Sequence, residues 1–165
     1  MSTTTKTADG TTTIEAVKDM PSIALSRDFA ATPAQLVRAH TDQELFVQWV
    51  GPNGMKIDID YWDARTGGSW RYVDSHEGEE YGFHGSFHEV REDRLVQTFT
   101  FEGFPDSVAL ETMWFEELGD GRTRLHIASL FDSYEARDGM LSSGMDVGVN
   151  DGYAKLDALL SSGVV

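Results

Sequence analysis

The chain has 165 residues, of which 40% are hydrophobic, and 28 acidic against 13 basic side chains give a formal net charge of −15. Its length fits one domain, and its acidic excess disfavours binding to nucleic acid or to anionic membrane surfaces, because both depend on Lys and Arg. The lack of cysteine excludes disulfides, a thiolate nucleophile and zinc–thiolate or iron–sulfur sites.

Targeting and cofactor motifs are also missing from the sequence. No apolar run approaches the roughly 20 residues of a membrane span, and the N-terminus lacks the apolar centre of a secretory signal. The sequence contains no phosphate-binding glycine loop, no Gly-x-Ser-x-Gly elbow and no His-Glu-x-x-His motif. We therefore expect a cytoplasmic protein without a metal or a cofactor, with no nucleic-acid partner and no insertion into a membrane.

The N-terminal segment, residues 1–19, is rich in threonine and polar, so it is predicted to be a disordered tail in which Ile14 and Val17 could anchor a short turn. Residues 20–165 are predicted to form a single domain. It begins with a strand in which Ile23 and Leu25 alternate with polar residues, and Arg27 falls on the same side of that strand.

Two short helices are expected next. Residues 32–35 place Thr32 as the cap, a proline at the first helical position and Gln35 three residues after the cap. Residues 41–44 repeat this capping pattern for a second helix, and Gly51 and Pro52 fall where that helix would end.

Alternating residues then predict about six strands, near residues 55–62, 70–73, 81–88, 95–101, 108–114 and 125–131. An antiparallel meander of this length curls and needs cover on its apolar face. One side of the strands is predicted to carry the aromatic residues Tyr61, Trp70, Tyr72, Phe83, Phe87, Phe99, Phe101, Trp114 and Phe131.

The apolar periodicity over residues 138–160 predicts one long helix, which would cover this sheet. Gly144, Gly148 and Gly152 recur every four residues and so align on one side of it. Each interior glycine costs about 1 kcal/mol relative to alanine. The row therefore indicates that either a neighbouring backbone or a cavity lies against that side.

Several short motifs, taken in order from about residue 22 to residue 161, resemble one family. They are residues 27–33 (RDFAATP), 41–45 (TDQEL), 48–52 (QWVGP), 63–70 (DARTGGSW), 85–90 (GSFHEV), 94–96 (RLV), 121–125 (GRTRL) and 152–159. Together they resemble the START-like "helix-grip" superfamily and, within it, the bacterial proteins similar to the activator of Hsp90 ATPase. The chain departs from this pattern at Val50 and Tyr153, where the family often has Trp.

The resemblance implies an α+β helix-grip fold, in which a strand, two short helices, about six antiparallel strands and a long C-terminal helix form one START-like ligand-binding domain over residues 20–165. It also implies a deep apolar cavity between the curved sheet and the helix. Across the superfamily such cavities bind lipids, sterols, polyketides and other hydrophobic molecules. The fold alone does not fix the activity.

For the ligand-binding site we predict eight lining residues: Tyr61, Trp70, Tyr72, Phe83, Phe99, Trp114, Met145 and Tyr153. The alternative for most of the aromatic residues is a filled core, since aromatic side chains are normally buried. No catalytic residue and no metal ligand is predicted.

Other chemically active residue types are interpreted as structural. His84, His88 and His126 are predicted on the outer face of the sheet, opposite the aromatic side, and the carboxylates Asp58 and Asp60 are predicted to be solvated. Arg27 falls on the apolar side of its strand and therefore needs a partner, for which a carboxylate near Asp63 is the candidate.

Three functions remain open at this point. The first is a non-enzymatic carrier or sensor of a small hydrophobic or aromatic molecule. The second is an enzyme similar to polyketide cyclases or hydrolases, with Arg27 and Tyr153 as the inward ionisable groups. A chaperone partner of Hsp90 type ranks last. The co-chaperone that gives the family its name has an additional large N-terminal region, whereas only a short segment precedes the first strand here. A homodimer formed through a sheet edge or the outer sheet face is also open.

Overall fold

The structure is a computed structural model that describes residues 2–6 and 11–165. One antiparallel sheet contains all of the strands, in the order β1-β2-β3-β9-β8-β7-β6-β5-β4. The strands are β1 (Ser2–Lys6), β2 (Thr11–Ala16), β3 (Ser22–Phe29), β4 (Lys56–Trp62), β5 (Ser69–His76), β6 (Glu79–Val90), β7 (Arg94–Phe101), β8 (Ala109–Gly119) and β9 (Arg122–Leu130). The predicted first strand and the six later ones are therefore confirmed.

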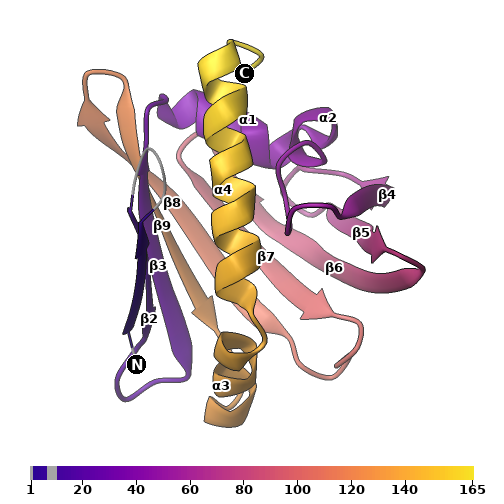
Figure 1. Ribbon diagram of the computed structural model, residues 1–165. Coiled ribbons are helices and arrows are strands. Elements are labelled where there is room, and N and C mark those ends of the chain that lie inside the picture. The colour runs from indigo at the N-terminus through magenta and orange to yellow at the C-terminus, as the bar shows by residue number, and fades with distance from the viewer. Residues whose placement is uncertain (1, 7–10) are drawn as a thin grey trace.

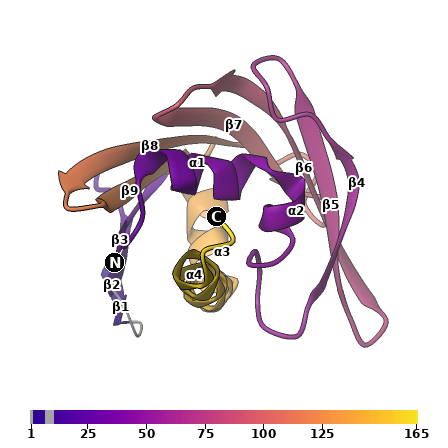
Figure 2. The same cartoon turned by 90° about the horizontal axis from the view of Figure 1, so that it is seen from above.

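The sheet curls around one long helix, α4 (Met145–Ser162), which crosses its concave face (Figures 1 and 2). The other helices are α1 (Pro33–Thr41), α2 (Gln43–Phe46) and α3 (Tyr134–Ser142). Seen from above, α1 and α2 lie across one end of the concavity (Figure 2). This is the predicted α+β helix-grip architecture.

Helix α1 begins as its sequence predicts. The hydroxyl of Thr32 accepts a hydrogen bond from the backbone N–H of Gln35, and the side chain of Gln35 accepts one from the backbone N–H of Thr32. The second helix, α2, has only four residues, and its cap is Asp42, one residue later than the capping pattern at Thr41 indicates.

The C-terminal helix is broken, which corrects the prediction of one helix over residues 138–160. Helix α3 ends at Ser142, and α4 begins after Gly144, whose φ of 88° lies in the left-handed region. Because this region is open to glycine at no steric cost, Gly144 ends one helix and redirects the chain into the next. The cap of α3 is Ser133, whose hydroxyl accepts a hydrogen bond from the backbone N–H of Ala136 at 3.1 Å.

The other two glycines of the row face backbone rather than a cavity. A Cβ atom on Gly152 would meet the carbonyl oxygen of Trp49 at 3.0 Å, and one on Gly148 would lie 3.5 Å from the ring of Pro52. The segment from Trp49 to Pro52, between α2 and β4, thus packs directly on α4. Of the two explanations for the row, the neighbouring backbone is correct for Gly148 and Gly152.

We expect Gly148→Ala to stabilise the protein by roughly 0.5–1 kcal/mol, because alanine favours the helix and its Cβ makes only an ordinary contact with Pro52. Urea denaturation measures this free energy of unfolding. The control is Gly144→Ala, which should destabilise the protein because alanine is strained at a φ of 88°. Equal effects of the two substitutions would contradict this account of the glycine row.

The N-terminal segment differs from the predicted disordered tail, because residues 2–6 form β1 and residues 11–16 form β2. Strand β2 pairs with both β1 and β3, and Ile14 is only 2% exposed. Because Ile14 belongs to the main hydrophobic core, the domain boundary expected at residue 20 does not separate this strand from the fold. The short apolar pair Ile14 and Val17 was too weak a pattern to predict a strand. Residues 1 and 7–10 of the expected tail lie outside the described residues.

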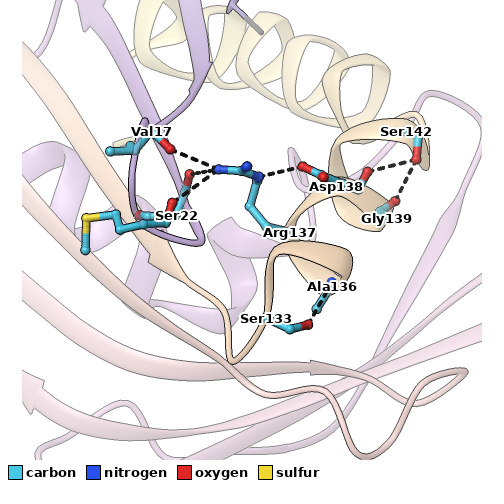
Figure 3. Close-up of polar contacts among 9 residues, drawn as sticks. Val17, Ser22, Ser133, Ala136, Arg137, Asp138, Gly139 and Ser142 are labelled. Atoms are coloured by element: carbon cyan, nitrogen blue, oxygen red, sulfur yellow. Dashed lines mark hydrogen bonds and ion pairs between the residues drawn. The ribbon is translucent and has the colours of Figure 1, made fainter.

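Arg137 fastens α3 to the turn between β2 and β3 (Figure 3). Its guanidinium donates hydrogen bonds to the backbone oxygens of Val17, Met20 and Ser22, at 3.1, 3.3 and 3.2 Å, and its Nε donates to Asp138 at 2.7 Å. The side chain is buried, so these carbonyl groups supply the partners that a buried cation needs.

The main core lies between α4, α1 and strands β2, β3, β7, β8 and β9, and Leu36, Leu125 and Leu156 are fully buried at its centre. A second cluster, around Trp70, Tyr72 and Phe87, lies on β5 and β6. Within the described part of the chain, no helix has the length and hydropathy that crossing a membrane requires.

Candidate functional site

The concave face of β7 and β8 changes along its length from fully packed to partly open. Near α1, where Phe115 contacts the ring of His40, Phe115 and Leu95 are 5% and 1% exposed. Further along the same strands, the inward-facing Gln97, Phe99 and Glu111 keep accessible surface. We call this partly open region, beneath the N-terminal half of α4, the concave site.

Glu111 is the polar centre of the concave site. Its direct neighbours on the adjacent strands are Gln97 and Ser129. Gln97 Nε2 and Ser129 Oγ each donate a hydrogen bond of 3.0 Å, one to each carboxylate oxygen. Burial raises the pKa of Glu111, and these two hydrogen bonds oppose the rise. Each oxygen has a further lone pair, so the carboxylate can still accept a bond from a ligand.

Two tyrosine side chains approach Glu111 from different elements, Tyr72 from β5 and Tyr153 from α4. Burial raises the pKa of both phenols; the charges of Asp74 and Glu111 raise that of Tyr72 further, and the charge of Glu111 raises that of Tyr153. Neither hydroxyl has a hydrogen-bond partner among the described residues. The site therefore combines a carboxylate with two hydroxyl groups that can still bond.

Aromatic rings form the wall of the site on the side of β5, β6 and β7. Tyr72 stacks on Trp70 at 5.5 Å and on Phe83 at 5.3 Å between ring centroids, and Phe83 contacts Phe99 at 5.5 Å. Phe83 also contacts Phe101 at 5.3 Å. A continuous aromatic surface thus runs from the edge of the concavity to the neighbourhood of Glu111.

A second carboxyl group, Asp74, faces the interior from β5. It is 6% exposed, it makes no hydrogen bond within the described chain, and its Oδ1 is fully buried. Burial raises its pKa to about 6, and the positive charge of Lys155 on α4 opposes the rise. The Nζ of Lys155 donates its hydrogen bond to the backbone oxygen of Gly51, at 3.0 Å, and not to Asp74.

Six of the eight predicted lining residues lie on the inner side of the molecule: Trp70, Tyr72, Phe83, Phe99, Met145 and Tyr153. The predictions for Tyr61 and Trp114 are wrong, because these side chains are 45% and 40% exposed on the outer face. A bulge between Ile59 and Tyr61 shifts the register of β4, so that Trp62 faces inward in place of Tyr61.

Trp114 was misplaced because both sides of β8 carry apolar residues. The inward residues are Ala109, Glu111, Met113 and Phe115, whereas Trp114 stacks on His126 of β9 at 5.1 Å on the outer face. A sequence signal for Glu111 did exist, since its neighbours two residues away on that side of the strand, Ala109 and Met113, are both apolar. Asp74 likewise follows Trp70 and Tyr72 in steps of two.

Arg27 faces inward as predicted, but its partner is Asp157 on α4 rather than a carboxylate near Asp63. Its Nη2 lies 2.6 Å from Oδ2 of Asp157 and its Nη1 lies 3.0 Å from Oδ1. The guanidinium also lies over the ring of Phe29, at 4.6 Å. The ion pair compensates the charge of Arg27 and ties β3 to α4.

The histidines are placed apart from the concave site. His84 and His126 contact Glu102 and Glu116 on the outer side of the sheet, at 2.8 and 3.0 Å. In residues 2–6 and 11–165, no cluster of three or more His, Asp or Glu side chains could hold a metal ion.

Two hollows in the described part of the chain have volumes of about 360 and 500 Å³. They lie around Glu102 and Arg124, so neither is between the sheet and α4.

Comparison with known proteins places the chain among proteins of one family. Residues 30–161 match the model of the family described as "Activator of Hsp90 ATPase homolog 1-like protein". This stretch includes every residue of the concave site named above, from Trp70 to Tyr153. No curated protein sequence matches the chain.

Solved structures with the same fold come from several bacteria. A protein from Rhodobacter sphaeroides is 27% identical, with a TM-score of 0.81 over 90% of this chain and 97% of its own. A protein from Mycobacterium smegmatis is 23% identical, with a TM-score of 0.80 over 96% of this chain and 97% of its own. One from Silicibacter pomeroyi, described as an activator of Hsp90 ATPase homolog, is 23% identical, with a TM-score of 0.68 over 86% and 99%.

Proposed function

Because the chain belongs to the family of activator of Hsp90 ATPase homolog 1-like proteins, whose fold is of the ligand-binding helix-grip type, we propose that it is a non-enzymatic, cytoplasmic carrier or sensor. Its ligand is a small hydrophobic or aromatic molecule, held in the concave site between the sheet and α4. A ligand-binding role in this family is a general property of the fold, so the choice of ligand depends on the residues of this chain.

The observation that carries the proposal is the position of Glu111. A buried carboxylate is costly unless it is hydrogen-bonded and paired with a cation, and Glu111 has two hydrogen bonds but no cation partner within the described chain. It lies beneath α4 with accessible surface and spare acceptor capacity. Convergent polar groups in a mostly apolar concavity are typical of a small-molecule site. Tyr72 and Tyr153 supply two more such groups, and the aromatic wall supplies the apolar surface.

The binding free energy would come mainly from the rings. Burial contributes roughly 25 cal/mol per Å² of apolar surface removed from water. The half-buried side chains Phe83 and Phe99 still have surface to lose, and so do Met145 and Val149 on α4. The polar groups would then set the orientation of the ligand rather than most of its affinity.

We expect Val149→Trp to weaken binding at least about tenfold, because Val149 lies one helical turn from both Met145 and Tyr153 and a larger ring would fill the site. Isothermal titration calorimetry with neutral aromatic alcohols, beginning with 2-(1-naphthyl)ethanol, measures the affinity. Val147→Trp is the matched control, since Val147 is 56% exposed on the same helix. Equal affinities in the two variants, or no binding of any small aromatic probe to the wild type, would contradict the proposal.

Acid–base catalysis is the second candidate function, and the raised pKa of the inward Glu111 favours it. In that case water would attack the ester carbonyl as the Glu111 carboxylate takes its proton, with the Tyr72 hydroxyl donating a hydrogen bond to the carbonyl oxygen. The ester C–O bond would then break, and the proton would pass from Glu111 to the leaving alkoxide. Hydrolysis of 1-naphthyl acetate, followed through the released naphthol, tests this function. If the rate is the same for wild type and Glu111→Gln, the reaction does not use the site.

A further inference from the structure

The ionisable groups around the concave site are unbalanced in charge. Glu111 and Asp74 are acidic and have no cation in direct contact within the described chain. The basic residues on this side are already engaged: Arg27 forms its ion pair with Asp157, and Lys155 donates to the backbone oxygen of Gly51. His40 is buried beside Trp49, with 7% of its surface exposed, and burial lowers its pKa to about 4, so it is neutral at pH 7. Glu111, Asp74 and Asp157 against Arg27 and Lys155 give these named groups a net charge of −1, and no cation contacts Glu111 within the described chain.

Unpartnered polar atoms give a second, independent indication of a ligand. Asp74 Oδ1 is a buried acceptor without a hydrogen-bond donor among the described residues. The indole Nε1 of Trp70, which is 3% exposed, is an unpartnered donor of the same strand in the described chain. Buried polar atoms normally have partners. An N–H donor on a ligand would satisfy the acceptor, and an oxygen on its ring would satisfy Trp70.

The aromatic wall is suited to the same chemistry. Ring faces attract a cation within about 6 Å of their centroids, most strongly for tryptophan and tyrosine. Tyr72 and Trp70 stack against each other, and Phe83 and Phe99 extend the surface toward Glu111. Aromatic ring faces and a carboxylate both attract an ammonium group. A ligand carboxylate would instead be repelled by Glu111, which has no cation in contact with it within the described chain.

We propose that the concave site selects small aromatic ligands with a protonated amine, which binds at Glu111 with Asp74 contributing to the negative potential, and that it rejects aromatic carboxylates. This inference rests on the proposed function, since it specifies the ligand class of the same site. The class is identified by its chemistry: an aromatic or aliphatic ring system joined by a short chain to a primary or secondary ammonium.

The test uses three probes that differ only in their polar group: 2-(1-naphthyl)ethylamine, 2-(1-naphthyl)ethanol and 1-naphthaleneacetate. Their affinities for the full chain are measured by isothermal titration calorimetry at pH 7.5. We expect the amine to bind about tenfold more tightly than the alcohol, and the carboxylate to bind more weakly than both. Binding of the alcohol with equal or tighter binding of the carboxylate would overturn the charge selection and leave the proposed function intact.

Substitutions of the two acidic residues test which side chain causes the preference for the amine. Glu111→Gln keeps the shape of the side chain, removes its charge and leaves one acceptor oxygen in place of two, so it should remove most of the preference for the amine while the alcohol still binds. Asp74→Asn should reduce the same preference by a smaller factor. The matched control is Glu116→Gln, which removes one carboxylate from the outer face of the same strand. An unchanged amine preference in Glu111→Gln would overturn the assignment to this residue.

One outcome would remove both proposals at once. If none of the three probes binds to the wild-type protein, the concave site does not take small aromatic molecules. Thermal unfolding of each variant separates loss of binding from loss of folding. Should Glu111→Gln be unstable, Asp74→Asn alone decides whether the negative potential selects the amine.

Discussion

Asp157→Asn should lower the free energy of unfolding by roughly 3–5 kcal/mol, because it removes the negative charge that Asp157 places against the buried guanidinium of Arg27. The side chain of Arg27 is fully buried and that of Asp157 is 11% exposed, so water cannot replace the lost partner. Urea denaturation at pH 7 measures the change. Because the pair joins β3 to α4, its loss should also weaken the contact between the helix and the sheet.

Two further variants test this explanation. Asp28→Asn breaks the pair between Asp28 and Arg124, whose side chains are 30% and 44% exposed, and should cost at most about 1 kcal/mol. The double substitution Arg27→Met and Asp157→Leu should recover much of the stability lost in Asp157→Asn, since it leaves no buried charge. If Asp157→Asn is no more harmful than Asp28→Asn, the ion pair is not the main link between β3 and α4.

Asp74→Asn should become more stabilising, relative to the wild type, as the pH rises from 4 to 7.5. Burial raises the pKa of Asp74 from 3.8 to about 6 in the folded protein. The contribution of this group to stability is thus fully present below pH 3.8 and is lost as the pH rises through about 6. Asparagine cannot ionise, so the difference between variant and wild type should grow by roughly 2–3 kcal/mol.

Urea denaturation at several pH values measures this difference. The groups that face Asp74 are Lys155 from α4 and Tyr72 from the same strand, and both are present in wild type and variant. The control is Asp58→Asn, which removes an exposed carboxylate from the neighbouring strand β4 and should follow the wild type. A stability difference between Asp74→Asn and wild type that does not change with pH would show that Asp74 ionises as freely in the folded protein as in the unfolded chain.

The fold could be predicted from the sequence because its signals are local and agree with one another. The cap Thr32 with Pro33 and Gln35, the alternation of the strands and the glycine-rich turns all depend on residues close together in the chain. The break at Gly144 could not be predicted, because a glycine with a positive φ looks in sequence like a glycine inside a helix. Strand β2 was missed because its single buried apolar residue, Ile14, gives no alternation.

The candidate site was only partly predictable, for a different reason. Alternating aromatic residues such as Trp70, Tyr72 and Phe83 predict an apolar face of the sheet. The groups that would orient a ligand are polar, and polar residues in a sequence are normally assigned to the surface. Glu111 and Asp74 lie on the inner face only because the register of the whole sheet carries them there. The partner of Arg27 could not be predicted either, since Asp157 is 130 residues away in the chain.

The most direct test of the central claim, that a small molecule binds between the sheet and α4, is an NMR titration of the protein with ¹³C-labelled methionine methyl groups. Met145 lies at the concave site, Met113 lies in the packed core, and Met20 is 43% exposed near the turn that Arg137 holds. With 2-(1-naphthyl)ethylamine as ligand, we expect the Met145 signal to shift and that of Met20 to stay, and Val149→Trp to abolish the shift. A titration that moves only Met20, or that moves no methionine, would contradict the claim.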